Sequence, residues 1–164
     1  MESEIEKYLN NFENKLKTIE ASSQMYSAIK AINSSNKTKC DQLVAEGVAL
    51  HQRGMKKAAL DKFDAALNLE IDVDALNNKG YILYESGDYS EAIRAFSAAI
   101  LLLPQFTNVY MNRLKVWAAL IRTYEFKGDY AGIEVAKKWL FWDADQMIKF
   151  GESPDAVSNY IESL

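Results

Sequence analysis

Three features of this sequence have residue types that could do chemistry: a histidine, a cysteine and an acidic cluster. His51 is the only histidine in the chain, so neither a two-histidine metal site nor a relay between two imidazoles can form. Cys40 stands near Lys37 and Lys39, and nearby cations favour a reactive thiolate. No base or second nucleophile accompanies it in the sequence. We therefore expect no catalytic residue.

The acidic cluster at Glu70, Asp72 and Asp74 has alternating carboxylates that could hold a metal ion. A calcium loop also needs a central glycine and a distal glutamate, and both are missing here. No glycine-rich phosphate loop follows a strand either. We expect no metal site, no cofactor and no enzymatic activity. The cluster is interpreted as an acidic turn between two structural units.

The composition narrows the class of protein. The 164 residues are 49% hydrophobic and include only two prolines, which is typical of a globular helical chain. A single cysteine favours a reducing compartment, and no apolar run approaches the ~20 residues needed to span a bilayer. The net charge of −4 argues against nucleic-acid binding. The start MESEIEKYLNN lacks the features of a signal peptide. We expect a cytoplasmic protein that binds neither nucleic acid nor membrane.

An internal repeat organises the middle of the chain. A shift of the sequence by 33 residues aligns small and aromatic positions with one another. Self-similarity at a fixed period of this size indicates a stacked-repeat fold. The aligned pairs include Asp41 with Asp74, Gly47 with Gly80, Leu50 with Leu83, Gly54 with Gly87, Ala59 with Ala92, Phe63 with Phe96 and Ala66 with Ala99.

Each copy predicts two antiparallel helices. In the second copy, Asp74 is predicted as the N-cap of the first helix and Gly87 as its end. Gly80 would let the partner helix approach closely, with Ala92 as the matching small surface. Phe96 would fill the wider space further along. The first copy has the equivalent residues 33 positions earlier.

This pattern resembles the tetratricopeptide repeat. The match lies in Gly80, Leu83, Gly87, Ala92, Phe96, Ala99 and Pro104, and less fully in Leu43, Gly47, Leu50, Ala59, Phe63 and Ala66. The resemblance implies an all-α, antiparallel helix-pair solenoid. It also implies a concave groove, lined by the first helix of each pair, that holds a peptide or helix of a partner protein.

A third, altered pair is predicted after the two repeats. Gly128-Asp129-Tyr130 repeats Gly87-Asp88-Tyr89 after 41 residues, so the helix at 107–127 should be about seven residues longer than its counterpart. Its expected buried stripe is Leu114, Trp117, Ile121 and Tyr124. In the next helix, Trp139, Phe141, Trp142 and Phe150 are expected to replace the small-residue packing. Ser153 and Pro154 should then start a capping helix.

The first 33 residues carry a different pattern. Apolar residues recur at alternating spacings of four and three, which indicates a heptad seam. Two interpretations stay open: a helix or helical hairpin folded against the first repeat, or self-association of two chains. The seam consists of Ile5, Leu9, Phe12, Leu16 and Ile19.

The predicted organisation has six parts. They are an N-terminal helical segment at 1–33, a linker at 34–40, repeat 1 at 40–72, repeat 2 at 73–106, an extended degenerate pair at 107–150 and a capping helix at 153–164.

Groove residues follow from the resemblance. The first wall would be Val44, Val48 and His51. The position of His51 between apolar and polar neighbours by itself predicts a side chain that is exposed to solvent. The second wall would be Asn77, Asn78, Tyr81 and Tyr84, and the third Met111, Asn112 and Lys115.

A clamp for acidic chaperone tails, known in this family, is not expected. Asn78 matches one of its positions, but Val44, Val48, Asn108 and Asn112 replace the others. A neutral or mildly apolar ligand fits better. Two functions remain: an adaptor that binds a partner in the groove, or a homo-oligomerising scaffold with the repeats as spacers.

Overall fold

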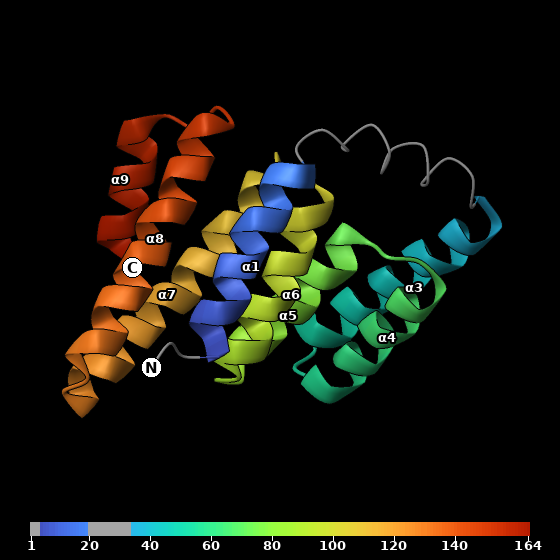
Figure 1. The fold of residues 1–164 in the computed structure, drawn as a ribbon. Helices are drawn as coiled ribbons and strands as arrows, with labels where there is room; N and C mark the ends of the chain where they lie inside the picture. The colour runs from blue at the N-terminus through green and yellow to red at the C-terminus, as the bar shows by residue number, and fades with distance from the viewer. Residues whose placement is uncertain (1–3, 20–33) are drawn as a thin grey trace. The chain divides into compact units, whose positions relative to one another are not determined.

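The secondary structure is entirely helical in the computed structural model, which describes residues 4–19 and 34–164 (Figure 1). No strand occurs among these residues, so the prediction of an all-α fold built from helix pairs is confirmed. The chain divides between Pro104 and Gln105 into two compact units, the first with α1 and α3 to α6 and the second with α7 to α9. The helices are α1 (Glu4–Ile19), α3 (Ser34–Gln52), α4 (Lys56–Leu69), α5 (Val73–Glu85), α6 (Tyr89–Leu102), α7 (Thr107–Lys127), α8 (Tyr130–Lys149) and α9 (Pro154–Ser163).

Glycine turns close the helix pairs. Gly54 and Gly87 have φ of 76° and 82°, a left-handed conformation that costs other residues energy. The residue after each glycine donates its N–H to the carbonyl five residues back, at 2.9 Å in both turns. This bond satisfies a carbonyl at the end of the first helix. The two pairs, α3–α4 and α5–α6, therefore turn in the same way, as the repeat predicts.

The close approach inside each pair depends on a phenylalanine. A Cβ built on Gly47 would lie 2.6 Å from a ring carbon of Phe63, and one on Gly80 would lie 2.8 Å from Phe96. Both rings are fully buried. The prediction that alanine supplies the surface opposite the glycine was wrong. Helical side chains lean toward the N-terminus of their own helix, which carries each ring back to the level of the glycine.

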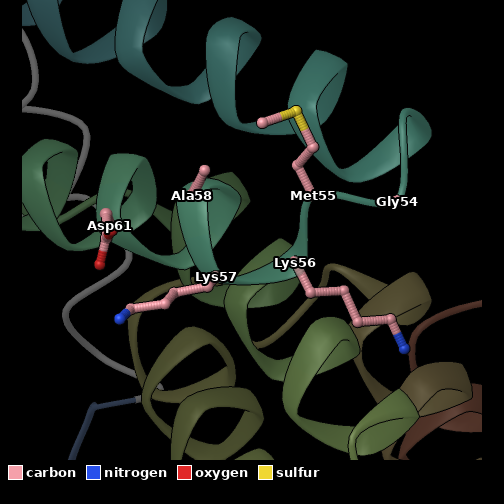
Figure 2. Close-up of a pocket in the computed structure, with 6 residues that line it drawn as sticks. All are labelled: Gly54, Met55, Lys56, Lys57, Ala58 and Asp61. Carbon is pink, nitrogen blue, oxygen red and sulfur yellow. The ribbon is translucent and has the colours of Figure 1, made fainter.

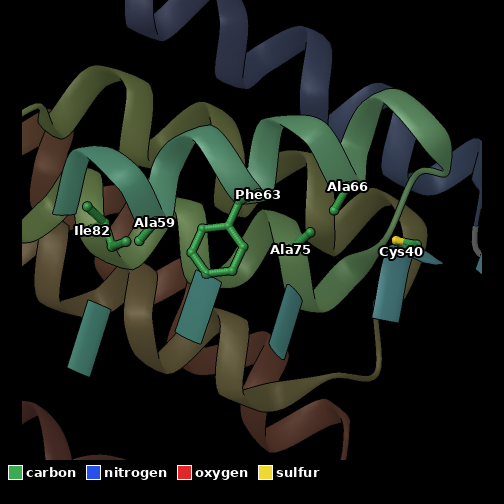
Figure 3. Packing of buried hydrophobic residues seen from close by; sticks show 6 residues of the cluster. All are labelled: Cys40, Ala59, Phe63, Ala66, Ala75 and Ile82. Carbon is green, nitrogen blue, oxygen red and sulfur yellow. The ribbon is translucent and has the colours of Figure 1, made fainter. Parts of the chain in front are cut away.

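A core cluster joins the two repeats of the first unit (Figure 3). Cys40, about two turns into α3, is fully buried in it. The segment 34–40 was predicted as a linker because its sequence is polar. It is instead helical, because burial of the Cys40 side chain stabilises this turn of the helix. The cluster consists of Cys40, Ala59, Phe63, Ala66, Ala75 and Ile82.

The N-cap of α5 is Asp72. Its Oδ1 accepts a hydrogen bond of 2.9 Å from the N–H of Ala75. Asp74, predicted as the cap, lies in the first turn of the helix, and its counterpart Asp41 lies well inside α3. The helix starts earlier than predicted because Val73 is also buried against the core.

The N-terminal helix α1 packs against α6 within the first unit. Leu9 and Phe12 are buried, and the guanidinium of Arg94 lies 5.4 Å from the centre of the Tyr8 ring. The helix therefore rests on repeat 2, whereas packing on repeat 1 was one of the two predictions. The rest of the predicted segment, residues 1–3 and 20–33, lies outside the described residues, as do the side chains of Leu16 and Ile19.

The second unit begins with the long helix α7 and its partner α8. Gly128, with φ of 68°, closes this pair as well. The last helix, α9, starts as predicted, because Ser153 Oγ accepts a hydrogen bond of 3.1 Å from Ala156 N–H and Pro154 follows. Val157 buries its side chain, and α9 packs against α8.

Large side chains fill this unit, although not all of those predicted. Leu114, Trp117 and Trp139 are buried, while Ile121 and Tyr124 are half-buried. Phe141 was expected inside but is 58% exposed. Phe141 lies off the face of α8 on which the buried side chains recur every three or four residues. These are Ile133, Ala136, Trp139, Leu140, Asp143, Ala144 and Met147.

A buried ion pair connects α7 to α8. Arg113 donates from Nη2 to Asp143 Oδ1 at 2.5 Å and from Nε to Oδ2 at 3.0 Å. The indole N–H of Trp117 also donates to Oδ2, at 2.9 Å. Both charged side chains are fully buried. Burial raises the pKa of the Asp143 carboxyl, and the guanidinium of Arg113 opposes this shift.

Candidate binding surface

Four aromatic rings form a continuous row in the first unit, which we call the aromatic row: His51, Tyr81, Tyr84 and Tyr89. The ring centres are separated by 5.9, 6.1 and 6.2 Å in that order. The rings come from three helices, since His51 belongs to the last turn of α3, two tyrosines to α5 and Tyr89 to the first turn of α6. All four side chains are partly exposed. The row thus offers aromatic surface to solvent on a rigid helical support.

A carboxylate lies beside the row. Glu85, the last residue of α5, has its Oε2 2.9 Å from His51 Nε2 and 3.2 Å from Lys56 Nζ. The Lys56 ammonium also donates to the backbone carbonyl of Glu85 at 3.3 Å. The hydrogen bond from His51, together with Lys56, holds the pKa of Glu85 below its usual value. This cluster links the end of α3, the start of α4 and the end of α5.

Several residues predicted for the first two walls also make contacts within the fold, and their part in a binding groove stays a prediction. Val44 and Val48 pack against the core cluster with part of their surface. The side-chain amide of Asn78 donates to the carbonyl of Asp74 at 2.8 Å, so it serves its own helix. Asn77 is half-buried. His51, for which solvent exposure was favoured, keeps only 25% of its side chain exposed.

The three residues predicted for the third wall lie on α7, in the second unit. Lys115 Nζ donates to Asn112 Oδ1 at 3.3 Å, and the carbonyl of Met111 accepts a hydrogen bond of 3.2 Å from the Tyr160 hydroxyl on α9. All three are half-buried. Their part in a binding groove stays a prediction.

A shallow hollow of about 550 Å³ lies at the α3–α4 turn (Figure 2). The side chains of Lys56 and Lys57 extend in opposite directions from it. Met55 is 46% exposed, and Lys56 pairs with Glu85. The hollow therefore shares Lys56 with the charged cluster beside the aromatic row. Its lining residues are Gly54, Met55, Lys56, Lys57, Ala58 and Asp61.

The described residues lack the features of two other kinds of site. Within residues 4–19 and 34–164, no three histidine, cysteine or acidic side chains are grouped so that they could hold a metal ion. Over the same part of the chain, none of the helices has the length and apolar character needed to cross a membrane.

The fold and this surface together define a helical-repeat protein with an exposed aromatic face. A family model of the tetratricopeptide repeat matches residues 73–106, which comprise α5, the Gly87 turn and α6. The resemblance predicted from Gly80, Ala92 and Phe96 is thereby confirmed, and residues 73–106 form a tetratricopeptide repeat. Such repeats are protein-interaction modules. No curated protein matches the chain.

Sequence reasoning missed three residues of the surface: Glu85, Lys56 and Tyr89. A signal for Glu85 was available, because it follows Tyr84, the residue one repeat period after His51. Since helix ends in adjacent repeats lie side by side, a histidine and a carboxylate at these positions should meet. Tyr89 and Lys56 begin second helices, which the groove prediction did not consider.

Proposed function

We propose that this protein is an interaction adaptor that holds a segment of a partner protein against the aromatic row. The observation that carries the proposal is the even spacing of four partly exposed rings across α3, α5 and α6. Tyrosine offers a large apolar area with a polar tip and few rotatable bonds, so it binds without a large loss of side-chain entropy. The match to a repeat family of interaction modules supports the same function.

The scaffold alternative has less support. It requires the heptad seam of α1 to be available to a second chain, but Leu9 and Phe12 are buried against the chain's own unit. Self-association through Ile5 and the remaining seam residues stays a prediction. A cytoplasmic location also stays a prediction, resting on the single cysteine.

Site-specific photo-crosslinking tests the adaptor function without disturbing the row. A benzophenone amino acid replaces Gln52, which is exposed and adjacent to His51 on α3. A second protein carries the same group at Asn68, an exposed residue of α4, as the matched control. In a lysate of the source cells, adducts should form at position 52 and not at position 68.

The second step asks whether the row is responsible. Tyr81→Ala/Tyr84→Ala, combined with the crosslinker at position 52, should reduce the adduct yield at least fivefold. Equal yields at positions 52 and 68, or an adduct that survives loss of both tyrosines, would contradict the proposed surface.

A further inference from the structure

We infer that this protein forms a two-fold symmetric dimer, in which the exposed face of α8 packs antiparallel against the same face of a second copy. The inference goes beyond the proposed function, because the aromatic row belongs to the first unit and α8 to the second. It follows from an apolar seam on this face and from the order of the charges beside the seam.

The exposed face of α8 carries three large apolar side chains, which we call the α8 seam. Tyr130 is 80% exposed, Phe141 58% and Ile148 37%. At about 3.6 residues per turn, these three positions lie within about 20° of one another around the helix axis. Lys137 lies on the same side and adds its aliphatic stem to the seam. Exposed apolar surface along a helix whose other side is already buried indicates an interaction surface.

Charged side chains follow one edge of the seam, with signs that alternate along the chain. This charged row consists of Glu134, Lys138, Asp145 and Lys149, all exposed. Because the spacings are four, seven and four residues, the row is symmetric about a point next to Phe141. A two-fold rotation about this point places Glu134 opposite Lys149 of the second copy. The same rotation places Lys138 opposite Asp145 of the second copy, so every charge in the row meets its opposite.

This symmetry selects a second copy as the partner. A two-fold interface uses the same surface on both subunits, so that surface must be complementary to itself. The charged row meets this condition when the two helices run antiparallel. In a parallel pair in the same register, each charge would face its own copy, which repels it.

The row also specifies the register of the antiparallel pair. A slip of four residues in one direction brings Lys138 opposite Lys149 of the second copy. A slip of four residues in the other direction brings Glu134 opposite Asp145. Both slips place like charges together at two symmetric points, so the register centred next to Phe141 is favoured.

The charged side chains make only local contacts within their own chain. The carboxylate of Glu134 lies 4.0 Å from the ammonium of Lys137. The ammonium groups of Lys138 and Lys149 each lie 5.4 Å from the centre of an adjacent aromatic ring. Exposed contacts of this kind contribute little to stability. The same side chains can therefore turn toward a second copy at small cost.

A dimer of this kind carries two aromatic rows. A partner protein with two binding segments would then be held at both, and the second contact would form at a high effective concentration. The dimer would therefore bind such a partner more tightly than a monomer does.

Sedimentation equilibrium of the full chain tests the dimer. A single helix face is smaller than the about 1,600 Å² of a standard interface, so we expect weak association with a Kd on the order of 10 µM. From tenfold below to tenfold above this concentration, the average mass should rise from the monomer toward the dimer. A monomer mass throughout overturns the inference.

Truncation of the seam then locates the interface. Phe141→Ala should weaken the dimer at least tenfold, because the two-fold symmetry removes two rings from one contact. The matched control is Ile71→Ala, since Ile71 is 62% exposed and lies in the first unit, and its dimer should be as strong as that of wild type. Circular dichroism verifies that each variant folds. Equal association by Phe141→Ala and Ile71→Ala overturns the inference.

A charge exchange tests the register. Lys138→Glu places a carboxylate opposite Asp145 of the second copy and should also weaken the dimer at least tenfold. Lys138→Glu/Asp145→Lys makes the two charges opposite again and should recover most of this loss. If the double variant associates no better than Lys138→Glu, the inference is wrong. The adaptor proposal is tested separately, because crosslinking at position 52 depends on tyrosines of the first unit.

Discussion

The helix pairs α5–α6 and α7–α8 turn in the same way but are held together differently. Both close on a left-handed glycine followed by the same backbone hydrogen bond of 2.9 Å. Inside α5–α6 the buried side chains carry no charge, and the contact between helices is Phe96 against the bare backbone of Gly80. Inside α7–α8 a fully buried Arg113 and Asp143 face each other.

The difference concerns how register is specified. A glycine that faces an aromatic ring fixes the register of two helices by shape, since only glycine leaves room for the ring. A buried ion pair fixes the register electrostatically, because a slip of one turn would leave two buried charges without partners. The second arrangement suits a pair built from longer helices, where two extra turns offer more ways to slide. The first suits the repeat, whose short helices have neighbours on both sides.

The largest expected effect comes from breaking the ion pair. Asp143→Ala leaves the Arg113 guanidinium buried without its carboxylate, and removes the acceptor of the Trp117 N–H. The free energy of unfolding, measured by urea denaturation, should fall by about 3–5 kcal/mol.

The double variant Arg113→Met/Asp143→Leu is the control, since it removes both charges together. It should recover much of the loss, because an apolar pair of similar volume avoids the desolvation of two ions. A loss below about 1 kcal/mol in Asp143→Ala would mean that the pair does not hold the helices.

The shape contact in α5–α6 should respond more moderately. Gly80→Ala places a Cβ 2.8 Å from the Phe96 ring, and such overpacking costs about 1–3 kcal/mol. Better helix propensity of alanine offsets up to about 1 kcal/mol of this. We expect a net loss of about 1–2 kcal/mol in urea denaturation. Adding Phe96→Leu to Gly80→Ala should reduce the clash, so that the two changes together cost less than their sum. Additive losses would show that the two residues do not determine each other.

Helix caps allow a matched test of the two units. Asp72→Ala and Ser153→Ala each remove the side-chain acceptor of a first-turn N–H. Each should cost about 1 kcal/mol. The loss should be larger for Asp72, because this residue is 6% exposed and water cannot readily replace its oxygen. Thermal denaturation of both variants checks the order, and a larger loss in Ser153→Ala would reverse it.

The smallest effect is expected at Glu85, whose ion pairs with His51 and Lys56 are partly exposed. The pKa of Glu85 is lowered from 4.5 by His51 and Lys56, so its carboxylate stabilises the fold above that pH. This contribution is lost as the pH falls through the lower folded value. Because the side chain is partly exposed, the contribution should stay below about 1 kcal/mol.

A pH series of unfolding measurements on wild type and Glu85→Gln makes this visible. Below pH 4.5 the two curves should converge, and above it the wild type should be the more stable. Glu91→Gln, which alters a more exposed carboxylate near Arg94, serves as the control. If the free energies of unfolding of wild type and Glu85→Gln differed by the same amount at every pH, the ion pair would not contribute to stability.

Much of the fold could be predicted because the residues responsible act locally. Gly54, Gly87 and Gly128 mark turns by their own conformational freedom, and the helix at 107–127 was predicted with its observed bounds. The cap at Ser153 depends only on its own first turn. Residues 34–40 were mispredicted because local polarity indicates a loop, while Cys40 is buried by side chains from other helices.

The candidate surface was predicted only in part. His51, Tyr81 and Tyr84 were predicted from the resemblance to the repeat family, and the structure brings their rings together. Tyr89 and Lys56 lie at the beginning of α6 and α4, the second helices of their pairs. Their distances to the surface depend on how the helix pairs pack against each other.

By itself, the sequence determined the helical class, the repeat and the positions of its turns, because hydrophobic period, glycine and capping residues act over a few neighbours along the chain. Only the tertiary structure decided that Phe63 and Phe96 occupy the space beside Gly47 and Gly80, and that Arg113 meets Asp143 thirty residues later. Those pairings depend on the rotation and axial offset of one helix against another. These are set by the packing of all side chains in the contact, and no local pattern encodes them.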